Sequence, residues 1–385
     1  MVIFTGQACS LRICFFGTYR AHYVRNQVMV AGLRAQGVEV LECHATLWRG
    51  VEDRVQQASG GWLRPRFWAR VARAYWQLWQ AHQRTPPYDV MLVGYPGHFD
   101  VYLARLLTWW RRRPLALDIL MSLHLIAEER GLTQKSPLTG RLLFWLEKGG
   151  LKLPNLLIAD TPEYEQYYCE KYHLSPTRFR RVPLGVDDRI YYPRPHLQPP
   201  AGRFRVLYYG TFIPLHGVEV IIRAAAELRD HPHVEFHLCG DGPERPAAER
   251  LAQELGLTNV HFRGWIDEAK LPDEIAQAHV CLGVFGTTKQ SRCTIQNKIW
   301  EGMMMQRPVI TGDSETVRQE LTHKQHVYLV ERASPQALAA AVLELETNPA
   351  LRQQLAMAGF ERAQANTIAA TGRATQEALR SLVRN

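Results

Sequence analysis

Short apolar runs alternate with helical patterns along the sequence, and the alternation starts again after a proline-rich stretch at residues 192–202 (YPRPHLQPPAG). Strands that alternate with helices form parallel sheets from βαβ units. The sequence therefore predicts an α/β protein with two domains, joined by this stretch and facing each other across a cleft. The twelve predicted strands cover residues 11–17, 38–41, 90–94, 115–120, 156–160, 180–183, 204–209, 234–239, 260–263, 280–284, 308–311 and 326–329.

Length and charge limit the classes of partner. With 385 residues, each of two domains can bury its own core. The formal net charge of +9 favours anionic partners, such as nucleotide diphosphates, acidic lipids or nucleic acid. Because the sequence has no nucleic-acid-binding motif and no basic tail, we expect no nucleic-acid partner. No apolar run reaches the ~18 residues that a membrane-spanning helix needs.

The cysteines and the N-terminal segment indicate a location. Seven cysteines without a CxxC pair are typical of reduced thiols, and we expect no metal site. The first residues, MVIFTGQACSLRICFF, lack the basic start of a signal peptide, so we interpret them as a first strand. We therefore expect a cytoplasmic protein, peripheral on the inner face of the membrane.

Residues 285–312 (FGTTKQSRCTIQNKIWEGMMMQRPVITG) carry the strongest functional signal. A basic loop with Lys289 and Arg292 precedes a helix with Asn297, Lys298 and Glu301. Loop cations and the free N–H groups of a helix N-terminus suit a diphosphate. Glu301, about two turns further on at ~1.5 Å per residue, suits the ribose of the same nucleotide. The alternative is a surface loop with ordinary solvated charges.

Two glycine-containing turns follow predicted strands of the second domain. Residues 206–217 (VLYYGTFIPLHG) place Gly210 and Thr211 after a strand, and residues 234–243 (VEFHLCGDGP) place Gly240 and Asp241 there. Ligands of α/β proteins bind at this end of the strands.

In this order and spacing, these motifs, together with residues 183–187 (PLGVD) before Tyr192-Pro193, resemble the retaining sugar-nucleotide glycosyltransferases of family 4. The likeness covers most of residues 155–330. It implies the GT-B fold, with two Rossmann-like domains. Residues 1–193 would form the acceptor-side domain, 203–365 the nucleotide-sugar-binding domain, and 366–385 a helix that crosses back onto the N-terminal domain.

The resemblance also implies the mechanism and the binding residues. Retaining transfer in this fold is usually explained without a protein nucleophile, so the protein stabilises the departing diphosphate. Positive side chains and helix N-termini suffice, and we expect no cofactor and no obligatory metal. Nucleotide-sugar-binding candidates in the second domain are Gly210, Thr211, His216, Gly240, Asp241, Asn297, Lys298 and Glu301.

The sequence departs from the family pattern at the diphosphate clamp. Thr211 and His216 stand where the family has Arg and Lys, and Cys293 replaces the first of two glutamates that lie eight positions apart. We expect Lys289 and Arg292, as catalytic residues, to replace the clamp, with help from Lys298 and from His216 as an imidazolium. The alternative is an inactive relative.

Five residues of the N-terminal domain complete the set of candidates. Gly17 and Thr18 end the first strand and would contact donor phosphate or acceptor, although the glycine could equally serve a turn. The family often places an Asp or His that contacts the transferred sugar near the position of Asp118 and His124, which are therefore catalytic candidates. Asp118 could instead cap the following helix. His98 is a candidate for acceptor contact.

Aromatic and basic residues gather in two stretches of the N-terminal domain. Residues 62–79 predict an amphipathic helix with four tryptophans and with Arg64, Arg66, Arg70 and Arg73, and residues 109–113 read WWRRR. Such mixtures suit an anionic membrane surface. The alternative is that the aromatic faces pack against the core.

The sequence therefore predicts a glycosyltransferase that moves a sugar, with retention, from a nucleotide-diphosphate sugar to a lipid-linked or cell-envelope saccharide acceptor. A nucleotide-sugar epimerase of the same fold and an inactive nucleotide-sugar-binding relative are the alternatives. Neither domain has the GxGxxG turn of a nicotinamide-dependent oxidoreductase.

Overall fold

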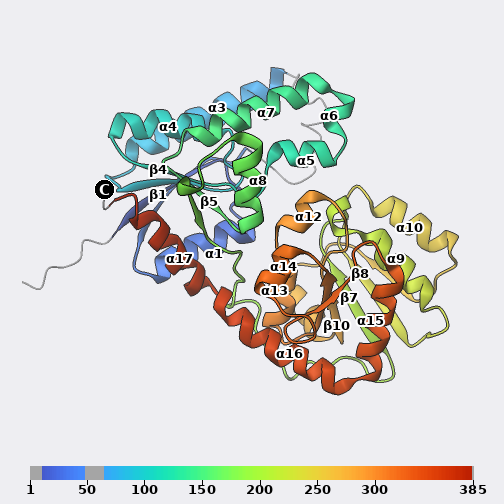
Figure 1. The fold of residues 1–385 in the computed structure, drawn as a ribbon. Helices are drawn as coiled ribbons and strands as arrows, with labels where there is room; N and C mark the ends of the chain where they lie inside the picture. The colour runs from blue at the N-terminus through green and yellow to red at the C-terminus, as the bar shows by residue number, and fades with distance from the viewer. Residues whose placement is uncertain (1–10, 48–64, 384–385) are drawn as a thin grey trace, which may run out of the picture. The chain divides into compact units, whose positions relative to one another are not determined.

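The computed structural model describes residues 11–47 and 65–383 and divides the chain into two compact units (Figure 1). The first unit comprises Met1–Pro183 and Ile368–Asn385, and the second comprises Leu184–Thr367. Each unit contains a six-stranded parallel sheet with helices on both sides (Figure 1). The two-domain α/β fold predicted from the alternation is thus confirmed.

The first unit has the strand order β2-β1-β3-β4-β5-β6. Its strands are β1 (Arg12–Gly17), β2 (Glu39–His44), β3 (Val90–Val93), β4 (Leu115–Asp118), β5 (Leu156–Ala159) and β6 (Phe179–Arg181). Its helices are α1 (Val24–Ala35), α3 (Pro65–Arg84), α4 (Asp100–Arg111), α5 (Leu123–Glu129), α6 (Leu132–Lys135), α7 (Pro137–Lys152), α8 (Pro162–Tyr172), the 3₁₀ turn η2 (Pro176–Arg178) and α17 (Ile368–Arg380).

The second unit has the strand order β12-β11-β10-β7-β8-β9. Its strands are β7 (Phe204–Tyr209), β8 (Val234–Cys239), β9 (Val260–Arg263), β10 (Val280–Leu282), β11 (Val309–Gly312) and β12 (Tyr328–Val330). Its helices are η3 (Pro214–His216), α9 (Val218–Glu227), α10 (Arg245–Glu254), α11 (Leu271–Ala276), α12 (Lys289–Cys293), α13 (Asn297–Met304), α14 (Glu315–Glu320), α15 (Pro335–Thr347), α16 (Pro349–Ala363) and η4 (Gln364–Asn366).

The strand order reverses once in each sheet. In the first unit β1 lies between β2 and β3, and in the second β7 lies between β8 and β10. α/β proteins generally bind ligands at such a reversal point, at the carboxyl ends of the strands, where the connections run away in opposite directions. The loops after β7 and β10 are the ones that the sequence singles out.

The core of each unit follows from strand periodicity. In β8, Val234, Phe236 and Leu238 are fully buried against the helices, whereas Glu235 and His237 on the opposite face remain partly accessible. Side chains alternate between the faces of a strand, so one apolar set joins the core. The same reasoning applies to Ile13 and Phe15 of β1 in the first unit, although the residues between them are buried too.

The C-terminal helix α17 belongs to the first unit, as predicted, and packs on α1. A Cβ atom at Gly372 would lie 2.1 Å from the carbonyl oxygen of Gly32, so only glycine permits this approach of the two backbones. Gln376 also donates from its side chain to the carbonyl of Gln36 across the same contact.

The chain passes from the first unit to the second after Pro183, earlier than the predicted domain boundary at residue 193. The side-chain amide of Asn366 donates to the carbonyl of Leu184 at 3.0 Å, and the Val186 amide donates to the carbonyl of Asn366 at 2.8 Å. These bonds tie the segment after Pro183 to the end of the second unit. The proline-rich stretch at 192–202 therefore belongs to the second unit and does not separate the two.

Candidate functional site

Two glycines bring the turns after β7 and β8 into direct backbone contact. Gly210 and Gly240 have φ values of +137° and +132°, where an L side chain is strained. A Cβ atom at Gly240 would lie only 2.0 Å from the Gly210 carbonyl oxygen. Both predicted glycines thus have a structural reason to be glycine. Asp241, the next predicted residue, is exposed and accepts a hydrogen bond from the Gly242 amide at 2.7 Å.

A third glycine brings the loop after β7 against the loop after β10. Gly217 has a φ of +65°, and a Cβ atom there would lie 2.5 Å from the amide nitrogen of Gly286. The Phe285 amide donates to the carbonyl of His216 at 3.0 Å. The turn that carries Thr211 and His216 is therefore fixed beside the segment that leads into α12.

Lys298 of α13 reaches the same turn. Its Nζ lies 4.2 Å from the centre of the Tyr208 ring and 3.5 Å from Nδ1 of His216. A Cβ atom at Gly210 would lie 2.9 Å from Nζ, so the missing side chain at Gly210 leaves room for the ammonium group. The structure thus brings together Gly210, His216 and Lys298, which the sequence placed in one site.

The protonation of His216 differs from the expectation. Its Nδ1 contacts the Thr211 carbonyl at 2.5 Å, and because a carbonyl only accepts, Nδ1 carries the proton. Burial and the nearby charge of Lys298 lower the pKa of His216 well below its ordinary value. The expected imidazolium is therefore wrong: the ring is neutral, and it positions the turn without adding positive charge to it.

Burial also brings the pKa values of the two charged groups of α13 close to each other. It lowers the pKa of Lys298 to about 7, against a smaller opposing effect of Glu301. It raises the pKa of Glu301 to about 7, while Lys298 and a hydrogen bond from Tyr209 act in the opposite direction. The residues are three positions apart, on one face of the helix. Both pKa values therefore lie near neutral pH.

The segment before α13 is not the predicted loop. Residues Lys289–Cys293 form the short helix α12, which the Thr288 hydroxyl caps by accepting from the Ser291 amide at 3.1 Å. Local capping chemistry overrides the loop prediction. Glu301 consequently lies about one turn, not two, beyond the start of α13 at Asn297.

The cations of α12 remain accessible. Lys289 and Arg292 are both exposed. The pKa of Arg332 is lowered to about 10, mainly by burial and secondly by the positive charge of Arg292. Arg332 donates to backbone carbonyls of both neighbouring loops, among them Gly286 at 2.9 Å and Asp313 at 2.7 Å. Sequence analysis missed Arg332, since no motif distinguishes it.

Polar atoms at the start of α13 lack partners. Both side-chain polar atoms of Gln296 and Oδ1 of Asn297 are buried and make no hydrogen bond in the described structure. Buried polar groups are normally satisfied, so such atoms mark a place where a ligand or water completes the bonding. Cys293 stands at the position of the missing family glutamate, three residues before Gln296, and it is also buried.

In the first unit, Asp100 occupies the turn after β1. Thr18 donates to its Oδ2 from both the amide, at 2.6 Å, and the hydroxyl, at 2.9 Å. Gly17 has a φ of +132°, and a Cβ atom there would lie 2.7 Å from the same oxygen. Burial raises the pKa of Asp100 to about 6 despite these bonds. The glycine thus serves the turn itself, and the Thr18 amide and hydroxyl are already engaged.

Asp118 pairs with Arg25 of α1 rather than with His124. The guanidinium donates through Nε and Nη2 to the two carboxylate oxygens at 3.0 and 2.8 Å, and both side chains are fully buried. Nη1 of Arg25 also donates to the Val182 carbonyl at 2.7 Å. Asp118 therefore fixes the end of β4 to α1, and it does not cap the following helix.

Glu147 of α7 organises the residues around His124. Its buried carboxylate accepts from the amides of Leu123 and His124 and from the hydroxyl of Tyr172, at 2.9, 3.0 and 2.6 Å. Nε2 of His98 lies 3.4 Å away. Burial opposes ionisation, but these partners together lower the pKa of Glu147 below its ordinary value. The sequence offered no signal for Glu147, a single acid in an apolar stretch.

Ser122, not Asp118, caps α5 by accepting from the Leu125 amide. His98 and His124 are both buried, and burial lowers the pKa of His124. The structure thus places His98, His124 and Glu147 together at the start of α5, while Asp118 belongs to a separate ion pair.

Aromatic side chains of the first unit are exposed on three helices. Trp68, Trp76 and Trp79 of α3 are exposed, and the rings of Trp76 and Trp79 stack at 4.9 Å. Trp109 and Trp110 at the end of α4 are 74% and 67% exposed, so these rings do not pack into the core. Trp62 and Arg64, also part of the predicted stretch, lie outside the described residues.

The third helix is α7, whose exposed apolar side chains the sequence did not predict. It exposes Leu138, Leu142 and Trp145, at 77%, 46% and 63%. None of the helices within residues 11–47 and 65–383 has the length and apolar character to cross a bilayer.

Known structures share the fold of the whole chain. The sucrose-phosphate synthase of Thermosynechococcus elongatus superposes with a TM-score of 0.72, at 19% identity, over 97% of this chain and 99% of its own. HepE of Anabaena, solved with UDP and glucose, gives a TM-score of 0.72 at 17% identity, over 97% and 100% of the two chains. The chain therefore has the GT-B fold of two Rossmann-like domains.

Residues 203–348 match the model of the glycosyl transferases group 1 family. The chain thus has the GT-B fold, and within its second unit residues 203–348 are similar to group 1 glycosyl transferases. The lipopolysaccharide core biosynthesis glycosyltransferase LpsD of Rhizobium meliloti is 32% identical over 44% of this chain and 46% of its own length. The alpha-D-kanosaminyltransferase of Streptomyces kanamyceticus is 31% identical over 47% and 44%. The chain thus matches less than half the length of these relatives.

Proposed function

We propose that the protein is a glycosyltransferase that moves a sugar, with retention, from a nucleotide-diphosphate sugar to an envelope saccharide or lipid-linked acceptor. The main observation behind the proposal is that Gly210, His216, Lys298 and Glu301 lie close together at the carboxyl end of β7. These residues lie in the segment that matches the group 1 family. HepE, a structural neighbour, is known in complex with UDP-glucose, which supports this class of donor.

The donor would bind with its diphosphate at Lys298 and its ribose at Glu301. Lys298 faces the space that Gly210 leaves open, and an anion there would favour its charged form. The unpartnered atoms of Gln296 and Asn297 would complete the hydrogen bonds of the ligand. Lys289 and Arg292 would face charge that grows as the bond to the sugar breaks.

Retention would follow from attack by the acceptor on the face from which the diphosphate leaves. Within the protein, only positioning and charge stabilisation are then required, with no protein nucleophile and no obligatory metal. In the first unit, His98 and His124, held by Glu147, would contact acceptor or transferred sugar through their ring nitrogens. Asp118, paired with Arg25, would position the chain and not react.

The exposed aromatic face would hold the protein on an anionic membrane. It consists of the tryptophans of α3 and α4 with the apolar residues of α7, and arginines such as Arg66, Arg73 and Arg113 accompany it. Tryptophan prefers the bilayer boundary, and arginine is attracted by acidic headgroups. The name of the relative LpsD, which refers to lipopolysaccharide core biosynthesis, supports an envelope acceptor.

An inactive nucleotide-sugar-binding protein is the second candidate. Thr211 and the neutral His216 replace the two usual cations of the family, and Cys293 replaces one glutamate. Such a protein would bind the donor without turnover. An epimerase of the same fold would change the free nucleotide sugar without any acceptor.

One assay separates these functions. The purified chain is incubated with UDP-, GDP- and ADP-sugars, with and without lipid-linked envelope oligosaccharides, and the products are resolved by chromatography. The proposal predicts acceptor-dependent release of a nucleoside diphosphate, and an NMR spectrum of the product with retained anomeric configuration. Donor binding without release would favour the inactive relative, and an altered sugar without acceptor the epimerase.

A further inference from the structure

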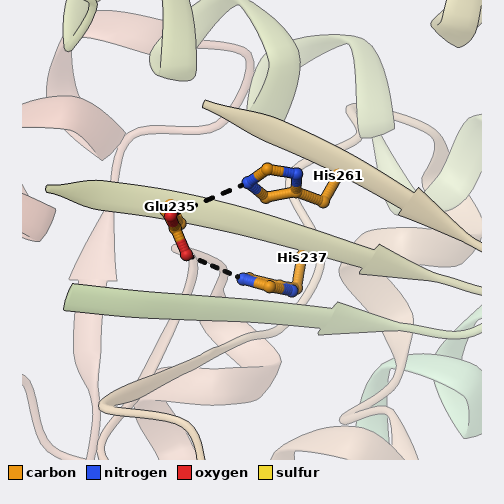
Figure 2. A group of neighbouring side chains, drawn as sticks. All are labelled: Glu235, His237 and His261. Carbon is orange, nitrogen blue, oxygen red and sulfur yellow. Dashed lines mark hydrogen bonds and ion pairs between the residues drawn. The ribbon is translucent and has the colours of Figure 1, made fainter. Parts of the chain in front are cut away.

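Three metal-binding side chains lie on one face of the sheet in the second unit (Figure 2). Glu235 and His237 are two residues apart on β8, so they point to the same side. His261, on the edge strand β9, lies directly opposite His237 in the register of the two parallel strands. One ligand atom from each residue lies within 4.8 Å of the other two.

The carboxylate of Glu235 lies between the two imidazoles (Figure 2). Its Oε2 is 3.3 Å from Nε2 of His237, and its Oε1 is 4.0 Å from Nε2 of His261. Ligands of a tetrahedral ion with bonds of about 2.0–2.1 Å lie roughly 3.3 Å apart. Small side-chain rotations would therefore bring all three atoms onto one ion.

We propose that Glu235, His237 and His261 bind a Zn²⁺ ion through two imidazole nitrogens and one carboxylate. Two histidines and a carboxylate form one of the common ligand sets of Zn²⁺, with water at the fourth position. Two nitrogen ligands also select against Mg²⁺ and Ca²⁺, which prefer oxygen. The ion would link the edge strand β9 to β8, and its role would be to stabilise that edge of the sheet.

Neighbouring arginines could compete with the ion for the Glu235 carboxylate. Arg203 pairs with Oε1 of Glu235 at 2.8 Å, but its side chain is 54% exposed and can leave for solvent. Arg205 and Arg263 both pair with Glu274 of α11, so they are already neutralised by another carboxylate. The ion therefore has to displace one exposed ion pair.

The zinc site is separate from the proposed donor site. Glu235 and His237 are the second and fourth of the six residues of β8, and His261 is the second of the four residues of β9, so all three precede the carboxyl ends of their strands. The donor residues Gly210 and Gly240 follow the carboxyl ends. The inference does not rest on the proposed function, and loss of zinc should leave donor binding intact.

Isothermal titration of ZnCl₂ into the chelator-treated, untagged full chain tests the proposal. We expect one ion per chain and no heat with MgCl₂. Because losing even an outer partner of a metal site costs about 10–100-fold in affinity, His261→Ala should weaken binding by at least roughly that factor. Arg203→Ala should strengthen it, because a competing cation is removed.

His233→Ala is the matched control, since His233 forms a similar pair with Glu346 at 3.3 Å elsewhere in the second unit. It should leave zinc affinity unchanged. Glu235→Gln keeps the size of the side chain and serves if His261→Ala does not fold. Absence of zinc binding, equal affinity in His261→Ala and Glu235→Gln, or loss in His233→Ala alone would overturn the proposal.

Discussion

At the scale of single residues, the burial of Lys298 provides a test of the proposed diphosphate site. Its pKa is lowered to about 7 because the ammonium is buried, and Glu301 offsets only part of that cost. A bound diphosphate would supply two further negative charges and raise the pKa towards its ordinary value. Binding should therefore take up a proton, and its strength should depend on pH.

We predict that the affinity for UDP falls as pH rises from about 7 to about 9, by up to tenfold per unit. The sign follows because the free protein loses the Lys298 proton above pH 7 while the complex retains it. Calorimetry in buffers of different ionisation enthalpy would measure both the affinity and the proton uptake. Lys298→Met should bind more weakly, with a flat profile over this window; a wild-type profile that is also flat would contradict this role.

We predict that Glu301→Gln changes the stability of the protein and its affinity for nucleotide in opposite directions. The buried carboxyl has a pKa of about 7 against 4.5 as its ordinary value, so the folded state holds its proton more tightly than the unfolded chain. Its contribution to stability therefore falls as pH rises from about 4.5 to about 7. Glutamine should make the protein more stable above pH 7, by thermal unfolding, yet weaken nucleotide binding by about 1.5–3 kcal/mol, the value of a charge-assisted hydrogen bond. A variant that is destabilised and binds normally would place the ribose elsewhere.

For the proposed donor site, the sequence predicted which residues lie together better than it predicted their protonation and pairing. The glycine turns and the polar face of α13 are local patterns, and the structure brings Gly210, His216 and Lys298 together. The neutral state of His216 and the pairing of Asp118 with Arg25 depend on burial and on partners far along the chain. Glu147 was missed for the same reason, because its five close partners come from three separate segments.

At the scale of elements, the amphipathic helix α3 was predicted correctly from residue 65 onwards. Its inner residue Leu78 is buried and its tryptophans are exposed, as the periodicity indicates. The contribution of α7 was not foreseen, because Leu138, Leu142 and Trp145 sit in a helix that also reads as core. The short helix α12 was taken for a loop, since five residues carry too little periodicity to predict a helix.

We predict that replacing Trp109 and Trp110 with serine abolishes sedimentation with vesicles that contain acidic lipid. Both rings are largely exposed, so the change removes contact with the bilayer boundary and little core packing. Trp265→Ser is the matched control, because Trp265 is 62% exposed in the second unit.

Charge should contribute to the same binding. Each arginine near an acidic surface adds about 1 kcal/mol, and salt weakens the attraction. Vesicles of neutral lipid should therefore bind the wild type less. Equal binding to both kinds of vesicle, or equal loss in Trp265→Ser, would mean that the aromatic face does not dock on membranes.

At the scale of the whole molecule, the fold was the most predictable property. All twelve predicted strands are present within a few residues, because continuous apolar runs bounded by glycine and proline are typical of parallel sheets. The unit boundary was predicted too late, since the proline-rich stretch is more conspicuous in sequence than the bonds of Asn366 that define the second unit.

We predict that a chelator leaves sugar transfer unchanged while it removes the proposed zinc. The diphosphate would be stabilised by Lys298, Lys289 and Arg292, whereas the proposed zinc ligands lie within strands β8 and β9. Initial rates with and without EDTA would be compared on the same preparation. Loss of turnover that Mg²⁺ or Mn²⁺ restores would show that a metal ion performs the task assigned to these cations.

We propose above that the second unit binds a nucleoside diphosphate at the carboxyl end of β7. A crystal structure of the protein soaked with UDP tests it most directly. We predict density for the diphosphate within hydrogen-bonding distance of Lys298 Nζ, beside Gly210, and for the ribose at the Glu301 carboxylate. Density for UDP elsewhere, with Lys298 still confined to His216 and the ring of Tyr208, would contradict it.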